Sequence, residues 1–277
     1  MSTSCSSSGT IIPLDEVKKL LLDLVSDLDG FCREKGIRYA LAYGSLIGAI
    51  RHKGIIPWDD DIDLWMPRPD FLRLLQEYAL AHPDSHYEFQ CMETDPEFPL
   101  NFAKFCDTRT ESVDQFGNRS AIAVDIFILD GLGQSLPEAE EFIRKVKRMQ
   151  RIWSNQRFTR RLKLSRQYNL KKNSYIFFAK AVSPFISFRR LVRDYILLKR
   201  SHPIEESRYC ANLNADFAIY ETSKMLEYTD APFEGRIFRI PAQYDHLLRT
   251  LYGDYMQMPP EGQRVVAHGS TAFWIRK

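Results

Sequence analysis

Four aspartates occupy positions within the five-residue stretch 59–63 of this 277-residue chain. Asp61 and Asp63 alternate with Ile62, so in a strand both carboxylates would point the same way, with Asp59 near them at the start of the strand. Carboxylates repel one another and are poor strand formers, so something must compensate for such a cluster. Carboxylate oxygens are hard ligands, which favours Mg²⁺, with Mn²⁺ as the alternative.

A further carboxylate, Asp125, lies in the almost entirely apolar run 121–129. That run predicts a strand buried on both faces, where an unpaired carboxylate costs several kcal/mol. Two interpretations are open at this point. Asp125 either completes a three-carboxylate metal site with Asp61 and Asp63, or it is a core carboxylate paired with an arginine.

The acidic stretch has two simpler interpretations. It could be a solvated acidic loop, which would be the preferred interpretation if the stretch stood alone. It could also be a calcium-binding loop, but Leu64 stands where such a loop needs glycine and Asp70 where it needs glutamate. The calcium loop is therefore rejected.

Residues just before the acidic stretch are suited to binding phosphate. Gly44 and Ser45 would offer backbone N–H groups and a hydroxyl at a turn, and Arg51, His52 and Lys53 would add positive charge. For each of these three bases, a solvated helix end is the alternative. Together with two divalent ions, this set of residue types serves phosphoryl transfer.

The elements that must position these residues follow from periodicity and breakers. Apolar residues spaced three and four apart predict a helix from residue 14 that Gly36 ends. Alternating or continuous apolar runs predict strands, and prolines and glycines mark their ends. The expected strands are 37–43, 61–66, 102–106 and 121–129, and further helices are expected at 46–52, at 70–81 and in the middle of the chain.

The stretch 44–63 resembles the signature of the LicD family of phosphocholine transferases, which is related to fukutin. The likeness continues through 102–105 and 124–131 and returns within 240–260. It implies a nucleotidyltransferase-like core of α+β class, a small mixed sheet flanked by helices, with a helical basic insertion. The family's glycine–hydroxyl pair falls on Gly44 and Ser45, where many members have threonine at the second position. Its carboxylates fall on Asp61, Asp63 and Asp125.

The resemblance also implies a reaction. Phosphocholine would pass from CDP-choline to a sugar hydroxyl of a cell-surface glycan such as lipopolysaccharide, teichoic acid or a capsule precursor, releasing CMP. Asp61 and Asp63 would hold two Mg²⁺ ions, and Asp125 would share the second and lie nearest the acceptor hydroxyl. Transfer of ribitol or glycerol phosphate is an alternative, because the fukutin branch moves ribitol phosphate.

A choline headgroup would need aromatic faces. Tyr43, Trp58, Trp65 and Tyr252 are the candidates, each with simple packing as the alternative. Two other functions remain to be weighed: an Asp-x-Asp glycosyltransferase acting on a nucleotide sugar, and a membrane-surface scaffold without turnover.

Charge is unevenly distributed along the chain. The segment 144–200 holds eighteen Lys and Arg residues against one acid, and the run 173–188 within it is rich in aromatics. Such a segment suits either peripheral contact with an anionic membrane or a helical lid over the core. No nucleic-acid-binding motif is present, so nucleic acid is not an expected partner.

The chain is expected to divide into a disordered tip (1–12), a catalytic core (13–135), a basic helical insertion (136–230) and a C-terminal segment that completes the site (231–277). The 44% hydrophobic and 27% charged residues are typical of a globular protein. Five scattered cysteines and the lack of a signal-like start predict a cytoplasmic location, with attachment to the inner face of the membrane as the alternative.

Overall fold

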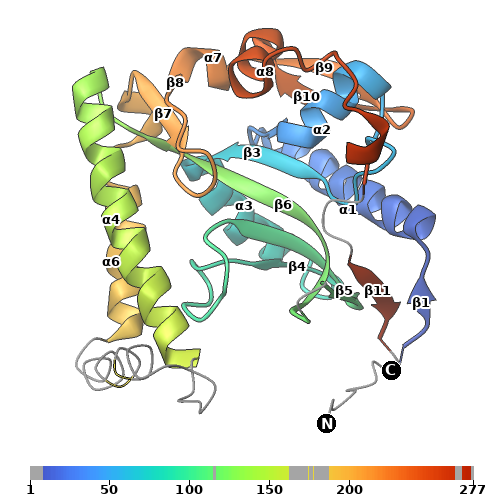
Figure 1. Ribbon diagram of the computed structural model, residues 1–277, viewed down its shortest axis with the longest axis horizontal. Coiled ribbons are helices and arrows are strands. Elements are labelled where there is room, and N and C mark those ends of the chain that lie inside the picture. The colour runs from blue at the N-terminus through green and yellow to red at the C-terminus, as the bar shows by residue number, and fades with distance from the viewer. Residues whose placement is uncertain are drawn as a thin grey trace. The chain divides into compact units, whose positions relative to one another are not determined.

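A computed structural model of the chain describes residues 9–114, 117–161, 187–265 and 270–275, together with residues 174 and 177 (Figure 1). The described chain is a mixed α/β protein, so the expected combination of helices with a mixed sheet is confirmed. It forms two compact units. The first comprises residues up to 90, 102–129 and from 223 onward, and the second comprises residues 91–101 and 130–222.

The first unit is built on a twisted mixed sheet. Its strands run β1-β11-β5-β6-β3-β2, with β4 added beside β5. The pairs are antiparallel except for β3 and β6, which are parallel. The strand bounds are β1 Ile11–Ile12, β2 Ala40–Leu41, β3 Asp63–Pro67, β4 Tyr87–Gln90, β5 Ala103–Val113, β6 Arg119–Gly131 and β11 Thr271–Trp274. A separate hairpin joins β9 (Tyr228–Phe233) and β10 (Arg236–Pro241).

Two long helices of this unit agree with the sequence prediction. Helix α1 (Leu14–Lys35) begins after Pro13 and ends at Gly36, whose φ of 64° is the left-handed conformation that glycine adopts without steric cost. Helix α3 (Arg68–Ala81) begins slightly earlier than expected. Each helix buries one apolar stripe: Leu21, Leu24 and Leu28 in α1, and Phe71 and Leu74 in α3.

The segment around the predicted phosphate turn differs from expectation. The expected strand 37–43 is reduced to β2, and a helix already begins at Tyr43: α2 (Tyr43–Ile47) runs directly into the π-helix η1 (Gly48–His52). Gly44 and Ser45 therefore lie inside a helix rather than in a turn before it. The chain passes from β2 into α2 at Tyr43, whose φ is 43°. This left-handed conformation costs about 1–2 kcal/mol for a residue with a side chain.

Two more expectations need correction. Strand β3 begins only at Asp63, so Asp61 precedes the strand instead of alternating along it. Mutual repulsion and poor strand propensity explain why the aspartates before Asp63 stay in a loop. The described end of the predicted disordered tip is ordered, because Ile11 and Ile12 form β1 and pair with Phe273 and Ala272 of β11.

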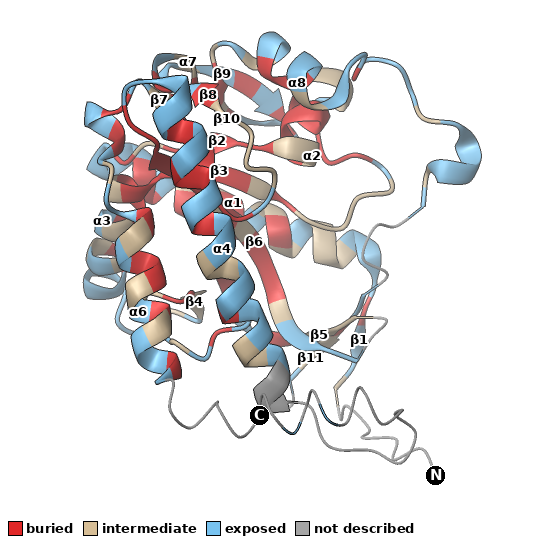
Figure 2. Cartoon of the chain, turned by 60° about the vertical axis from the view of Figure 1, so that its left-hand side comes forward, coloured by how far each residue is buried: buried red, intermediate tan, exposed pale blue. Residues whose placement is uncertain are grey.

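The described part of the second unit contains two long helices. Helices α4 (Leu136–Arg161) and α6 (Phe188–Lys199) bury their apolar faces in the core of the unit, where Trp153 stacks on Tyr195 at 6.3 Å between ring centroids. Figure 2 shows buried residues in red alternating with exposed residues in pale blue along α4. A short hairpin, β7 (Tyr209–Asn212) and β8 (Tyr220–Glu221), completes the unit.

The exposed faces of α4 and α6 carry the bases. Arg144, Lys145, Arg190 and Arg193 are each at least 60% exposed. Most of the aromatic run 173–188 lies outside the described residues, so its expected membrane or lid role is a prediction. Across the described ranges, no helix combines the length and the apolarity that crossing a membrane requires. The remaining short helices are η3 (Ile204–Glu206), α7 (Thr222–Leu226), α8 (Tyr244–Tyr252) and η4 (Glu261–Gln263).

Candidate active site

One row of charged residues crosses three neighbouring strands of the first unit. Asp63 of β3 is the register partner of Asp125 of β6, and Asp125 is the register partner of Lys104 of β5. Register partners on adjacent strands point to the same face of a sheet. Leu64 and Ile126, the next pair along, point to the opposite face and are fully buried. Asp63, Asp125 and Lys104 therefore lie side by side on one face.

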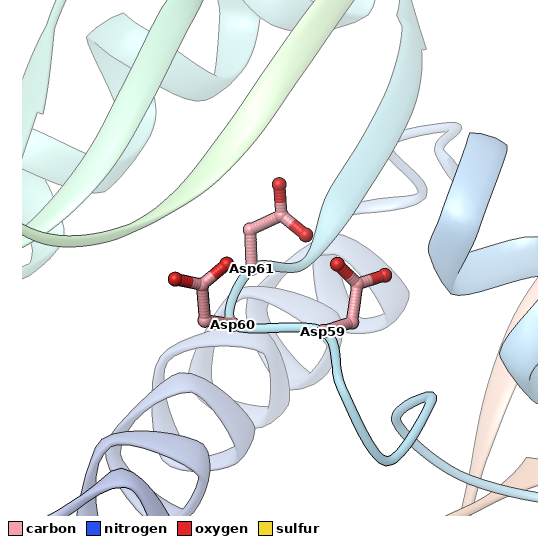
Figure 3. A group of neighbouring side chains, drawn as sticks. All are labelled: Asp59, Asp60 and Asp61. Atoms are coloured by element: carbon pink, nitrogen blue, oxygen red, sulfur yellow. The ribbon is translucent and has the colours of Figure 1, made fainter. Parts of the chain in front are cut away.

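Three further carboxylates precede this row in the loop leading into β3. Asp59, Asp60 and Asp61 each place a carboxylate oxygen within 4.8 Å of the others, and all three side chains are half-buried. Figure 3 shows them projecting from consecutive positions of that loop. Although Asp61 lies outside the strand, its charge still acts on Asp63.

The electrostatic environment of Asp63 is strongly negative. Burial raises the pKa of this carboxyl well above its usual range, and the charges of Asp61, Asp125 and Asp59 raise it further. The ammonium of Lys104 lowers the pKa of Asp63, but by less than burial and the carboxylates raise it. Ionised Asp63 is thus unfavourable in this environment, and an added cation would relieve the repulsion.

Lys104 is a site residue that the sequence analysis did not single out. Its Nζ lies 2.5 Å from Oδ1 of Asp125, and the two side chains are only 17% and 13% exposed. Burial alone would lower the pKa of Lys104, but the charge of Asp125 and the hydrogen bond to it outweigh burial and raise that pKa. The basic partner of Asp125 is thus a lysine and not the arginine of the alternative interpretation, and the metal role of Asp125 stays a prediction. A lone lysine in the apolar strand 102–106 was the available signal.

Gly44 and Ser45 both contact the carboxylate region. A Cβ at Gly44 would lie 2.8 Å from Oδ2 of Asp59, so a side chain at this position would push that carboxylate away from the helix. The hydroxyl oxygen of Ser45, which is 5% exposed, accepts a 2.9 Å hydrogen bond from the backbone N–H of Asp63. In this structure both residues therefore position aspartates, and their expected contact with phosphate is a prediction.

An aromatic group lies on the same face as the charged row. The ring of Tyr43 meets those of Trp65 and Phe127 edge-on at 4.9 and 5.0 Å, and Phe127 lies 4.9 Å from Phe102. Trp65 is 1% exposed, and its contact with a choline headgroup stays a prediction. Tyr43, Phe127 and Phe102 are half-buried.

Of the predicted phosphate-binding bases, Arg51 and His52 are half-buried and Lys53 is exposed. Nη1 of Arg51 donates to the carbonyl oxygens of Tyr255, at 2.6 Å, and Gln257, at 3.2 Å. Burial lowers the pKa of Arg51, and burial together with Arg51 lowers the pKa of His52. The ring of His52 meets Trp58 edge-on at 6.0 Å. Arg51 thus ties η1 to the chain after α8.

Lys53 and Tyr252 are the most accessible of the expected site residues. Lys53 is exposed and ends η1 with a φ of 60°. Tyr252, the last residue of α8, is 46% exposed. The structure places neither within the charged row, and their roles are predictions.

The donor set fits a hard divalent cation. Asp59, Asp60, Asp61, Asp63 and Asp125 supply only carboxylate oxygens, the ligand type that Mg²⁺ and Mn²⁺ prefer. The excess of negative charge around Asp63 favours binding of such a cation as well. The fold and site together define a mixed α/β protein with a carboxylate-rich face.

Comparison with known proteins identifies the family. A family model described as the LicD/FKTN/FKRP nucleotidyltransferase domain matches residues 36–131, which include every carboxylate described above. The lipopolysaccharide cholinephosphotransferase LicD of Haemophilus influenzae is 30% identical over 271 residues, covering 95% of this chain and 98% of its own length. The chain belongs to the LicD family.

Two shorter matches add to this. Ribitol 5-phosphate transferase FKRP of Homo sapiens is 57% identical over 35 residues, 13% of this chain and 7% of FKRP. A Rickettsia prowazekii protein of uncharacterised function is 39% identical over 56 residues, 20% of this chain and 21% of its own.

Proposed function

We propose that this protein transfers phosphocholine, or a similar phospho-alcohol, from a CDP-activated donor to a sugar hydroxyl of a cell-surface glycan and releases CMP. Its membership of the LicD family supports the reaction class, and the names of two relatives support a phospho-alcohol as the transferred group. The observation that carries the proposal is the pairing of Asp63 with Asp125 on one face, beside Asp59, Asp60 and Asp61.

The proposed reaction is an in-line substitution at phosphorus. The oxygen of the acceptor hydroxyl forms a new bond to the phosphorus that carries the alcohol. The bond from that phosphorus to the bridging oxygen breaks, and CMP leaves with that oxygen. The hydroxyl proton passes to Asp125, the carboxylate that we place nearest the acceptor.

Asp61 and Asp63 are the residues that we expect to hold Mg²⁺, with Mn²⁺ as the alternative, and Asp125 shares the second ion. Asp59 and Asp60 extend the ligand set. When bound, two divalent ions stabilise the attacking and the leaving oxygen of such a displacement. The hydrogen bond from the backbone N–H of Asp63 to Ser45 supports this role, because it fixes the start of β3.

The donor and acceptor ends draw on the remaining residues. Lys53, which is exposed, and the hydroxyl of Ser45 are the groups that we expect to contact the phosphate of the departing CMP. The exposed bases of α4 and α6 suit peripheral contact with an anionic membrane, where lipid-linked acceptors are found. Changing Arg190 and Arg193 to Gln should then weaken co-sedimentation with phosphatidylglycerol vesicles.

A donor panel tests the proposal. The protein is incubated with CDP-choline, CDP-ribitol and UDP-sugars, each with a lipopolysaccharide acceptor, in Mg²⁺ and in EDTA, and nucleotide release is followed by mass spectrometry. CMP should be released from a CDP-alcohol in Mg²⁺ only. Asp61→Asn should abolish release, whereas Asp23→Asn, at an exposed carboxylate on α1, should not.

Other outcomes of the panel point elsewhere. UDP release from a nucleotide sugar would identify a glycosyltransferase. If no donor turned over and Asp61→Asn changed nothing measurable, the protein would be a scaffold that kept the fold without catalysis.

A further inference from the structure

A lysine ammonium already occupies the carboxylate face. Lys104 pairs with Asp125 at 2.5 Å, in register with it on the next strand. Asp125 is in turn in register with Asp63. Nζ of Lys104 also lies 5.5 Å from the ring centroid of Phe102, a favourable contact for a cation. The ammonium is thus held by the carboxylate of Asp125 and by the ring of Phe102. Asp125 is also the carboxylate that the proposed reaction needs as a metal ligand.

Asp125 cannot serve two close cations without cost. An ammonium hydrogen-bonded to its Oδ1 and a divalent ion on the same carboxylate would repel each other in a half-buried site, where charges are weakly screened. Withdrawal of one of the two cations would relieve this repulsion. Lysine has a flexible four-carbon stem, so the ammonium is the group that can move.

We propose that Lys104 is an internal counter-ion that holds Asp125 while the carboxylates are without a divalent cation and passes to a phosphate of the donor once they bind one. This inference rests on the proposed function, which supplies the cation and the phosphate. It assigns Lys104 a positioning role in the empty site and a donor-binding role in the loaded one.

The exchange has two steps: Lys104 leaves Asp125 when the cation binds, and it then pairs with a phosphate of the donor. The second step follows from burial. Lys104 is only 17% exposed, and a buried ammonium that loses its carboxylate partner needs another anion. Asp125 and Asp61, whose charges raise the pKa of Lys104, are among the aspartates that would then be binding cations. A phosphate group arriving with the donor is the anion that the proposed reaction brings to this face.

Cation affinity, measured without donor, tests the first step. Mn²⁺ serves as the probe, and its free concentration is read by electron paramagnetic resonance. Lys104→Met removes the competing ammonium and should bind Mn²⁺ at least roughly tenfold more tightly than the wild type, because the repulsion between two close cations in a half-buried site exceeds the free energy of a tenfold change. Lys104→Arg keeps the charge and should stay within about threefold of the wild type.

The wild-type chain tests the exchange without any variant. In metal-free protein, Lys104 should resist reductive methylation, because it is paired and largely buried. Adding Mn²⁺ should raise its labelling several-fold in peptide mass spectra, and adding CDP should restore protection. Exposed Lys19 of α1 provides the internal reference, and its labelling should not change.

The outcomes separate this inference from the function beneath it. Equal Mn²⁺ affinity in wild type and Lys104→Met, or labelling of Lys104 that Mn²⁺ leaves unchanged, would overturn the exchange while leaving the transferase proposal standing. Absence of Mn²⁺ binding in every form would overturn both. Tighter Mn²⁺ binding by Lys104→Met together with weaker CDP binding would establish the exchange.

Discussion

Replacing Asp63 by asparagine should remove metal binding while leaving the fold intact. Asp63 lies among carboxylates whose charges, after burial, raise its pKa well above the usual range. In the metal-free protein, an ionised carboxylate in that position lowers the free energy of unfolding. Asparagine keeps the shape of the side chain and removes the charge, so the metal-free variant should be at least as stable as the wild type.

The magnitude can be worked from the register. Asp63 and Asp125 are partners on adjacent strands, which lie about 4.8 Å apart. Two unit charges about 5 Å apart repel by about 3 kcal/mol at an effective dielectric constant of about 20. Lys104 offsets part of this, because it pairs with Asp125 at 2.5 Å. We therefore expect the free energy of unfolding of Asp63→Asn in EDTA to lie between no change and a gain of about 2 kcal/mol.

Urea denaturation in EDTA and in excess Mg²⁺ measures this, with CMP release as the parallel readout. Magnesium should stabilise the wild type, by about 2.7 kcal/mol at one hundred times its dissociation constant, and should not stabilise the variant. The matched control is Asp70→Asn. Asp70 is 5% exposed and pairs with Nη2 of Arg38 at 2.6 Å, so its replacement should cost about 1.5–3 kcal/mol with or without Mg²⁺.

One result would refute the reasoning. If Asp63→Asn lost more than about 2 kcal/mol in EDTA, as a structural carboxylate does, Asp63 would be needed for the fold rather than for a cation.

Three further predictions concern the same site. Gly44→Ala would bring Cβ to 2.8 Å from Oδ2 of Asp59, so Mn²⁺ affinity and transfer should fall about tenfold as the carboxylate moves away, with little change in melting temperature. Ser45→Ala leaves the backbone N–H of Asp63 without its acceptor and should cost about 1–3 kcal/mol in urea unfolding, and Ser45→Thr should restore most of it. EDTA should abolish CMP release and added Mg²⁺ should recover it; turnover that persists in EDTA would contradict the metal role of the aspartates.

Local signals sufficed for the framework of the first unit. Apolar spacing with Pro13 before and Gly36 after defined α1 to the residue, because helix ends depend on nearby backbone groups. The apolar run at 121–129 predicted β6, which pairs with β3 along one edge and with β5 along the other. These elements are determined by patterns a few residues long, which a single sequence displays.

The parts that sequence could not supply depend on distant contacts. Helix α2 begins early because Tyr43 adopts a left-handed conformation and packs on Trp65 and Phe127, far along the chain. The role of Lys104 follows from its register with Asp125, which no local pattern reveals. Alternation wrongly placed Asp61 on the strand beside Asp63: β3 begins only at Asp63, because repulsion keeps the consecutive carboxylates before it out of strand pairing.

The stretch 44–63 behaves as one physical unit in which residues that are not ligands hold the aspartates in place. Gly44 admits the carboxylate of Asp59, and Ser45 anchors the backbone of Asp63. A Cβ at Gly48 would lie 2.4 Å from the carbonyl oxygen of Gly54, a backbone atom that cannot give way easily, so the loop before β3 folds back closely on η1. Substituting these small residues should therefore impair cation binding in the same way as losing an aspartate, although none of them supplies a ligand.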